Sequence, residues 1–196
     1  MKKTFTGEFG VIDLNKLADH KLLFGFFAEQ LAYPDKHTFQ EGAFAKGVFP
    51  PSIEEEIDVY WQQMQQFSLE DIQENYVQLF DFQQRSTLYM TYAKFEDAKE
   101  RGQMLAKLKS MYEMFGLEIT NNELADYLPL ICEFIYAADW STHEHAEPSF
   151  QTLLAVMEDG TYGLLKALEK LQSPYYYLVK GLRELFKLCL AEEVKA

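Results

Sequence analysis

The sequence has few cysteines, and this shortage excludes a disulfide-stapled secreted scaffold. Only Cys132 and Cys189 occur in 196 residues, whereas small secreted domains that depend on disulfides are dense in cysteine. Each of the two stands in an apolar helical run, which predicts two buried free thiols. Cysteine use of this kind favours a reducing compartment, and the cytoplasm is the default expectation.

Long apolar runs are also missing. No stretch approaches the roughly 18 uninterrupted apolar residues that a membrane span requires. The start MKKTFTGEF has two lysines but no apolar segment after them, so it is a poor signal peptide. We therefore expect a soluble protein without stable membrane association.

Positive charge is scarce. Lys and Arg total 18 against 31 Asp and Glu, which gives a formal net charge of −13 and a pI near 4.7. Such a chain repels phosphate backbones and anionic lipid, so nucleic acid is not expected as a partner. The same charge either draws in a basic peptide or serves solubility alone, and charge by itself does not decide between the two.

Apolar content, in contrast, is ample. Hydrophobic residues make up 48% of the chain and aromatic residues 15%, which argues for a globular core and against disorder. Apolar residues recur with the helical period of 3.6 along most of the sequence. The pattern predicts an all-α fold, a single-domain bundle of roughly eight to nine helices over residues 1–196, with a possible polar linker at 139–148.

Capping signals place the helices of the first half. One helix begins after Asp13 or Asn15 and closes at Tyr33-Pro34, and it is apolar on more than one face. A capping box at Ser52-x-x-Glu55 predicts the next start, and Ser68 begins a helix through about Phe80. The apolar stripe and neighbouring apolar faces of the first helix, which closes at Tyr33-Pro34, carry Leu22, Leu23, Phe24, Phe26, Phe27 and Leu31.

The second half follows the same logic. Residues 86–92 read as an irregular connector, and a helix runs from about Asp97 to Phe115, where Gly116 ends it. A capping box at Thr120-x-x-Glu123 predicts a helix through Ala138, bent at Pro129 or broken near Asp126. Two further helices are expected within 150–171, and a last one after Ser173-Pro174.

Signatures of catalysis are missing. The chain has no phosphate-binding loop, no GxSxG elbow and no HExxH motif, so an ordinary enzyme is not expected. His143-Glu144-His145 with Glu147 is the one cluster that resembles metal ligands. A stable zinc site needs three or four converging ligands, so a solvated loop is the better account. A small metal-binding helical protein remains an alternative function.

Tyrosine is abundant, and its polar end tolerates exposure. Most of the 16 Phe and 12 Tyr belong in the core. Some tyrosines are also suited to line a groove for an apolar helix: Tyr89, Tyr92, Tyr127, Tyr175, Tyr176 and Tyr177.

Three motifs carry a family resemblance. They are Tyr76-x-x-Leu79-Phe80-Asp81, then Arg101-Gly102-Gln103, then Leu124-x-Asp126-x-Leu128-Pro129-Leu130-x-x-Glu133. In this order and spacing the chain resembles the NarJ-type chaperones, assembly factors of respiratory nitrate reductase within the TorD/DmsD group. Clear similarity covers Asn75 to about Ile135, roughly a third of the chain.

The resemblance implies a non-enzymatic, all-helical (TorD-like) chaperone. Such proteins bind the N-terminal segment of the nitrate reductase catalytic subunit in the cytoplasm. They keep the apoenzyme ready for insertion of its molybdenum cofactor before membrane attachment, and they bind no cofactor stably themselves. Similar chaperones serve dimethyl sulfoxide, trimethylamine oxide and formate enzymes, so another client is the main alternative.

Candidate peptide-binding residues follow from the motifs and the tyrosine clusters. The wider group has Pro-x-Asp-His near its peptide surface, and here Asp126 is kept while Tyr127 replaces the histidine. Asp126 either contacts the client or caps a helix ahead of Pro129, and Arg101 either pairs with an acid or contacts the client. The full set is Tyr76, Leu79, Phe80, Tyr89, Tyr92, Arg101, Asp126, Tyr127, Leu128, Pro129 and Glu133, of which Tyr76, Leu79 and Phe80 are also good core residues.

Overall fold

The computed structural model describes residues 10–39, 47–95, 97–120, 122–140 and 146–191. These ranges contain eight α-helices, one π-helical segment and no strand, which confirms the predicted all-α class. The elements are α1 (Leu14–Asp19), α2 (Lys21–Leu31), α3 (Pro51–Met64), α4 (Leu69–Tyr76), the π segment η1 (Val77–Asp81), α5 (Ala98–Met114), α6 (Leu128–Ala137), α7 (Ala146–Lys170) and α8 (Tyr175–Leu188).

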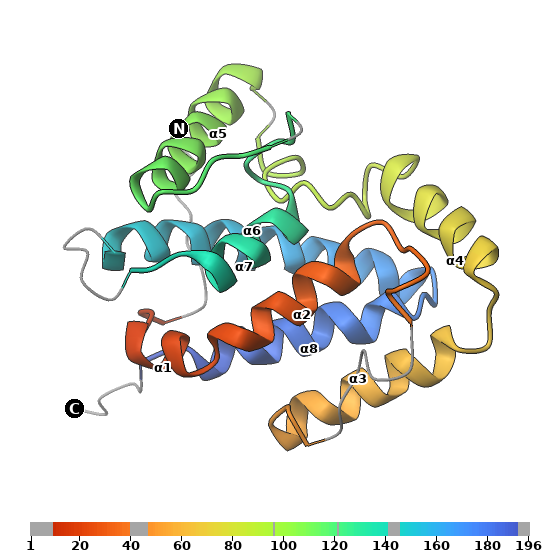
Figure 1. The fold of residues 1–196 in the computed structure, drawn as a ribbon. Helices are drawn as coiled ribbons and strands as arrows, with labels where there is room; N and C mark the ends of the chain where they lie inside the picture. Colours follow the sequence, from red (N-terminus) through yellow and green to blue (C-terminus); the bar gives the residue numbers. More distant parts are fainter. Residues whose placement is uncertain (1–9, 40–46, 96, 121, 141–145, 192–196) are drawn as a thin grey trace.

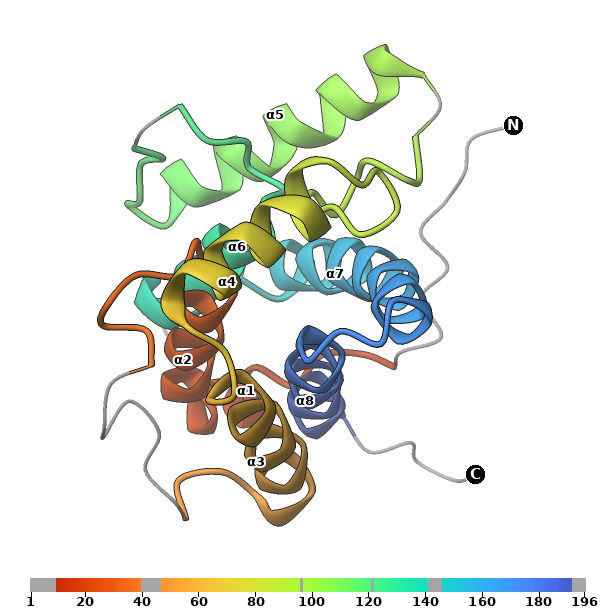
Figure 2. The ribbon, with the colours of Figure 1, turned by 90° about the vertical axis from the view of Figure 1, so that its right-hand side faces the viewer.

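Three helix pairs hold the bundle together. Helix α2 packs along α6, α3 along α8, and α7 along α8 (Figures 1 and 2). Fully buried aromatic rings join the layers, and Phe24 of α2 lies 5.3 Å from Phe186 of α8 between ring centroids. Helix α5 lies at one edge of the bundle in both views. The strongest packing is therefore around α2 and α8.

The first predicted helix is two helices. Asp13 caps α1 by accepting from the backbone N–H groups of Asn15 and Lys16, as expected of an N-terminal aspartate. The chain then leaves helical geometry at His20, whose ring nitrogen lies 2.8 Å from the carbonyl oxygen of Lys16. The same carbonyl oxygen also accepts from the backbone N–H of His20. Helix α2 starts anew at Lys21 and ends at Leu31, before the predicted Tyr33-Pro34 stop.

Helix starts were predicted at two serines of the first half, Ser52 and Ser68, and the structure confirms a serine cap only at Ser68. The helix start predicted at Ser68 is confirmed, and it is a capping box: Ser68 accepts from the backbone N–H of Asp71, whose carboxylate accepts from the backbone N–H of Ser68. The box predicted at Ser52 is wrong. Pro50 occupies the cap position of α3 and Pro51 its first turn, where a missing N–H costs nothing. The helix after Ser68 continues beyond Phe80 through one wider π turn.

Pro129 begins a helix instead of bending one. The predicted capping box at Thr120 is wrong, because residues 117–120 and 122–127 form no helix and α6 starts at Leu128. Proline suits a first turn because it has no N–H to satisfy there. The backbone N–H of Leu128 instead donates to the carbonyl of Leu88, 2.8 Å away. The irregular segment before α6 is thereby tied to the predicted irregular connector at 86–92.

Helix α7 is continuous where two helices were predicted. Its 25 residues span both expected segments, and the glycines between them stay helical. At Gly160 an added Cβ would lie 2.8 Å from the Cα of Met90. The connector thus packs directly on the helix backbone, and glycine serves close packing here instead of ending a helix.

Three other expectations concern cysteine, metal and membrane. Cys132 and Cys189 are buried free thiols, as predicted, and burial raises the pKa of Cys189 to about 12. His143 and His145 of the predicted linker lie outside the described residues, and the described residues hold no cluster of metal-ligating side chains. Within the same ranges no helix combines the length and apolar character of a membrane span.

Candidate peptide-binding groove

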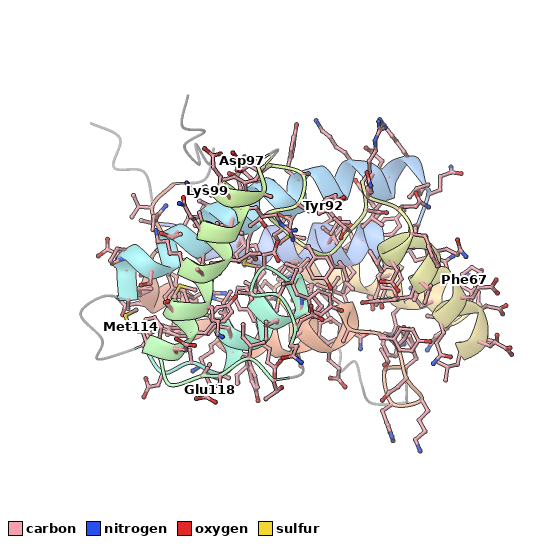
Figure 3. The ribbon with its side chains drawn as sticks, turned by 90° about the horizontal axis from the view of Figure 1, so that it is seen from above. Phe67, Tyr92, Asp97, Lys99, Met114 and Glu118 are labelled. Atoms are coloured by element: carbon pink, nitrogen blue, oxygen red, sulfur yellow. The ribbon has the colours of Figure 1, made fainter. Side chains whose placement is uncertain are left out.

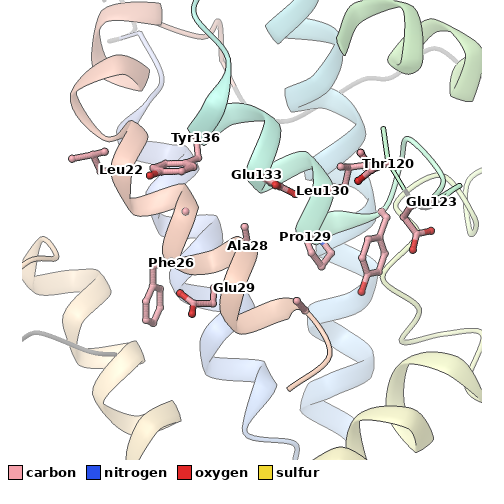
Figure 4. Close-up of a pocket in the computed structure, with 13 residues that line it drawn as sticks. Leu22, Phe26, Ala28, Glu29, Thr120, Glu123, Pro129, Leu130, Glu133 and Tyr136 are labelled. Atoms are coloured by element: carbon pink, nitrogen blue, oxygen red, sulfur yellow. The ribbon is translucent and has the colours of Figure 1, made fainter. Parts of the chain in front are cut away.

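A groove of about 730 Å³ opens between α2 and the start of α6 (Figure 4). We call it the α2–α6 groove. Helix α2 forms one wall and α6 the other, while the irregular segment of residues 117–120 and 122–127 closes one end through Thr120, Glu123 and Tyr127. Its lining is Leu22, Gly25, Phe26, Ala28, Glu29, Ala32, Thr120, Glu123, Tyr127, Pro129, Leu130, Glu133 and Tyr136.

The sequence of α2 explains how this wall arises. Leu23 and Phe27 of its buried stripe point into the core, while Leu22 remains 76% exposed and Phe26 is half-buried. Leu22 and Phe26 are four residues apart and share one helical face, separate from the buried stripe. The Phe26 ring packs against Phe49, 5.0 Å away between ring centroids, whereas Leu22 leaves its apolar surface in water. A binding partner would cover that surface.

Helices α2 and α6 approach each other closely at a glycine. An added Cβ at Gly25 would lie 3.0 Å from the Tyr136 ring of α6. The missing side chain leaves room for the ring, which is 45% exposed and lines the groove. Gly25 thus sets the width of the groove at this end.

The groove carries negative charge. Glu29 on α2, Glu123 on the irregular segment and Glu133 on α6 line it, and none of its lining residues is a lysine or arginine. Figure 4 shows Glu29 and Glu133 on opposite walls. Apolar side chains between facing carboxylates suit a ligand that is apolar on one side and basic at its edges.

Asp126 fixes the end wall from inside. Its side chain is fully buried and accepts from the backbone N–H of Thr91 at 3.0 Å and from the Thr91 hydroxyl at 2.5 Å. The guanidinium of Arg101 forms an ion pair with the same carboxylate oxygen at 3.4 Å. The backbone carbonyl of Asp126 accepts from the N–H of Met90. One buried carboxylate thereby joins the connector, α5 and the groove wall.

Hydrogen bonds from tyrosine hydroxyls also link the end wall of the groove to the rest of the fold. Tyr76 donates to the carbonyl of Leu31, and its hydroxyl lies 3.0 Å from that of Tyr127 in the groove. Tyr89 donates to Glu123 at 3.0 Å. Burial, followed by this hydrogen bond, raises the pKa of Tyr89 to about 12, and burial raises the pKa of Tyr127 and Tyr76 as well. These hydroxyls keep their protons at neutral pH and remain hydrogen-bond donors.

The structure brings three predicted site residues to the groove: Tyr127, Pro129 and Glu133. Pro129 is nevertheless buried. Five other predicted residues are buried and do not line the groove, namely Tyr76, Leu79, Phe80, Asp126 and Leu128. Arg101 pairs with an acid, one of its two expected roles. Asp126 is not a helix cap, because Tyr127 occupies the cap position of α6.

Tyr89 and Tyr92 belong to another face. The hydroxyl of Tyr89 reaches Glu123, but neither ring lines the groove. In the view from above, Tyr92 lies on the face that carries the start of α5 at Asp97 and Lys99 (Figure 3). The Arg101 guanidinium stacks 5.4 Å from the centroid of its ring.

Sequence reasoning missed the α2 wall. Leu22, Phe26 and Glu29 lay outside the motifs that carried the resemblance, so no role was assigned to them. The signal was nevertheless present, because α2 is apolar beyond the stripe that one buried face requires. Part of this additional apolar surface, at Leu22 and Phe26, lines the groove.

Comparison with known proteins agrees with this architecture. The family described as "Nitrate reductase delta subunit" matches residues 48–177. A Bacillus subtilis protein named "Probable nitrate reductase molybdenum cofactor assembly chaperone NarJ" is 32% identical over 165 residues, covering 82% of this chain and 86% of that protein. The Escherichia coli K12 "Nitrate reductase molybdenum cofactor assembly chaperone NarJ" is 27% identical over 111 residues, or 54% of this chain and 47% of its own.

A second Escherichia coli K12 protein, "Probable nitrate reductase molybdenum cofactor assembly chaperone NarW", is 28% identical over 115 residues, 59% of this chain and 47% of its own. The class is therefore a helical chaperone and not an enzyme. The chain belongs to the nitrate reductase delta subunit family, and the resemblance to NarJ-type chaperones is confirmed.

Proposed function

We propose that this protein is an assembly chaperone of respiratory nitrate reductase. It binds the N-terminal segment of the catalytic subunit and keeps the apoenzyme competent for molybdenum cofactor insertion before membrane attachment. Family membership supports the class of client. The observation that carries the binding mode is an apolar groove with carboxylates on both walls and no cation in its lining.

The client segment binds as an amphipathic helix. Its apolar side covers Leu22, Phe26 and Leu130, which the fold leaves partly or largely in water. Its basic residues lie near Glu29 and Glu133, both of which are exposed at the groove. Apolar burial provides most of the affinity, while the carboxylates favour basic segments and set the orientation.

The candidate residues divide between contact and positioning. Tyr127, Pro129 and Glu133 contact the client, because they line the groove. Asp126 and Arg101 act through the end wall that they hold. Tyr76 supports Tyr127 from behind, and Leu79, Phe80 and Leu128 pack the core beneath. Tyr89 positions Glu123 through its hydroxyl.

The chaperone itself holds no cofactor stably in this proposal. It assists insertion by occupying the client's N-terminal segment, so that the apoenzyme does not complete its fold or attach to the membrane early. The cofactor enters the client and stays there. A chaperone that only binds a segment needs no catalytic residue.

The test is calorimetric titration with two peptides. One covers the first few dozen residues of the nitrate reductase catalytic subunit from the same genome, and the other covers the same region of another molybdoenzyme. We expect micromolar or tighter binding of the nitrate reductase peptide alone. Equal binding of both peptides would favour a chaperone with a broader or different client, and no binding of either would overturn the proposed mechanism.

A charge variant tests the groove itself. Glu29→Gln with Glu133→Gln removes one carboxylate from each wall, and we expect the peptide affinity to fall about three- to tenfold, mostly at low salt. The matched control is Glu55→Gln with Glu70→Gln, two exposed acids outside the groove. Equal losses in the two variants would point to net charge and not to the groove.

A further inference from the structure

A second concave surface lies between the connector and the C-terminal half of α7. Two adjoining hollows of about 310 and 370 Å³ share Gln84, Arg85, Ala93 and Gly163. We call them together the α7 trough. It has no lining residue in common with the α2–α6 groove. Each hollow falls in the size range of small-molecule sites.

The charge of the trough is opposite to that of the chain. Arg85, Lys166 and Lys170 line the larger hollow without any carboxylate, in a protein of net charge −13. These three cations form no ion pair with any described residue. The smaller hollow contains Asp159, which is paired with Lys94. Cations that converge on a hollow without a protein counter-ion favour an anionic ligand.

Gly163 keeps the floor of the trough open. A glycine inside a helix costs about 1 kcal/mol relative to alanine, so its presence needs a reason. At Gly160 the reason is close packing, because an added Cβ would clash with Met90. At Gly163 packing gives no reason, because an added Cβ would have no atom within 4 Å. Gly163 lines both hollows, so any side chain there would project into the trough.

The aromatic ring of Tyr92 borders the larger hollow, which Arg85, Lys166 and Lys170 also line. Tyr92 lines it and is 40% exposed, although tyrosine rings in this fold are otherwise often buried. The Arg101 guanidinium lies over one face of the Tyr92 ring, so a flat ligand would stack on the other face. A ligand that combines a flat ring with a phosphate group matches both parts of this lining.

We propose that the α7 trough binds a small phosphate-bearing ligand that carries a flat heterocyclic ring. The Arg85 guanidinium pairs with two phosphate oxygens, and Lys166 and Lys170, one helical turn apart on α7, supply two further charges. The ring stacks on Tyr92. This site does not depend on the client groove, so each proposal is tested without the other.

The probe is flavin mononucleotide, with riboflavin as its phosphate-free partner. Flavin fluorescence anisotropy at physiological salt gives the affinity of the full-length protein for each. We expect flavin mononucleotide to bind at least about tenfold more tightly than riboflavin, because the phosphate meets three cations. Inorganic pyrophosphate should compete. Equal affinities for the two flavins, or no binding of flavin mononucleotide at millimolar concentration, would overturn the proposal.

Two variants locate the site. Arg85→Glu with Lys170→Glu should weaken flavin mononucleotide binding at least about tenfold, while Lys36→Glu with Lys109→Glu, which changes net charge equally, should leave it unchanged. Gly163→Leu should abolish binding without loss of thermal stability, because leucine favours helix and meets open space. Gly102→Leu on α5 is the matched control, also in open space.

A vesicle experiment separates a free phosphate ligand from a lipid headgroup. Sedimentation with anionic phosphatidylglycerol vesicles should leave the protein in the supernatant. The opposite result is that the wild-type protein sediments with the vesicles, the Arg85→Glu, Lys170→Glu variant does not, and flavin mononucleotide does not bind. It would overturn the small-ligand assignment in favour of a membrane surface. Binding of flavin mononucleotide that is unchanged in Gly163→Leu would place the ligand elsewhere and overturn it as well.

Discussion

The carboxylate of Asp126 accepts a 2.5 Å hydrogen bond from the hydroxyl of Thr91, which lies 35 residues earlier in the chain. Both side chains are fully buried. Since Arg101 reaches the same two groups, one polar cluster joins the connector, α5 and the end wall of the α2–α6 groove. Asp126, which the family resemblance assigns to a peptide-binding surface, is thus a buried residue behind the end wall of the groove.

Replacing Asp126 should therefore affect both stability and binding. Asp126→Ala leaves Thr91 and Arg101 without their acceptor, and we expect a loss of about 3 kcal/mol in the free energy of unfolding. Peptide affinity should fall as well, because the wall that carries Glu123 and Tyr127 loses its anchor. Urea denaturation and calorimetric titration measure the two effects.

Thr91→Val separates positioning from contact. The variant keeps the shape of a side chain that does not line the groove. It removes the hydroxyl that donates to the Asp126 carboxylate and accepts from the Arg101 Nε. A hydrogen bond to a charged group is worth about 1.5–3 kcal/mol. We expect it to weaken stability and peptide binding in the same direction as Asp126→Ala. Asp81→Asn, an exposed acid of the same family motifs, is the control. Normal stability with weak binding in Asp126→Ala, and no effect in Thr91→Val, would restore direct contact by Asp126.

The two serines predicted to cap helices should respond differently to alanine. Ser68→Ala removes a side-chain cap and should lower the free energy of unfolding by about 1 kcal/mol. Ser52→Ala should change it by less than about 0.5 kcal/mol, because α3 has no side-chain cap. Denaturant midpoints report both. A comparable loss at Ser52 would mean that Pro50 and Pro51 do not start the helix as described.

Alkaline pH should destabilise the protein through its tyrosines. Burial, and then the hydrogen bond to Glu123, raise the pKa of Tyr89 from 10 to about 12. The folded state holds this proton more tightly, so the stabilisation is complete below pH 10 and is lost as pH rises through 12. We expect the free energy of unfolding to decline over this range, and less steeply in Tyr89→Phe. An identical decline in the variant would remove Tyr89 from the explanation.

Local patterns predicted much of the fold. Asp13, Ser68, Gly116 and the Ser173-Pro174 start all mark helix boundaries by chemistry that is complete within a few residues. The role of Pro129 and the continuity of α7 were not predicted, because both depend on distant partners. The carbonyl of Leu88 accepts a hydrogen bond from the N–H of Leu128 at the start of α6, and Met90 packs against the α7 backbone at Gly160. Neither contact leaves a local pattern.

The groove was predictable only in part. The motifs that identify the family contributed Tyr127, Pro129 and Glu133, all near the start of α6. They also contributed Asp126 and Tyr76, whose burial follows from tertiary packing and not from residue type. The opposite wall on α2 lies about a hundred residues away, and only the packing of α2 along α6 brings Leu22 and Phe26 into the site.

The most direct test of the α2–α6 groove is calorimetric titration of the nitrate reductase peptide into Leu22→Ser and its matched control Leu171→Ser. Leu22 is 76% exposed and Leu171 43% exposed, so neither change should lower the melting temperature appreciably. Our account predicts about tenfold weaker peptide binding in Leu22→Ser and wild-type affinity in Leu171→Ser. Wild-type affinity in Leu22→Ser would place the client elsewhere and contradict the account.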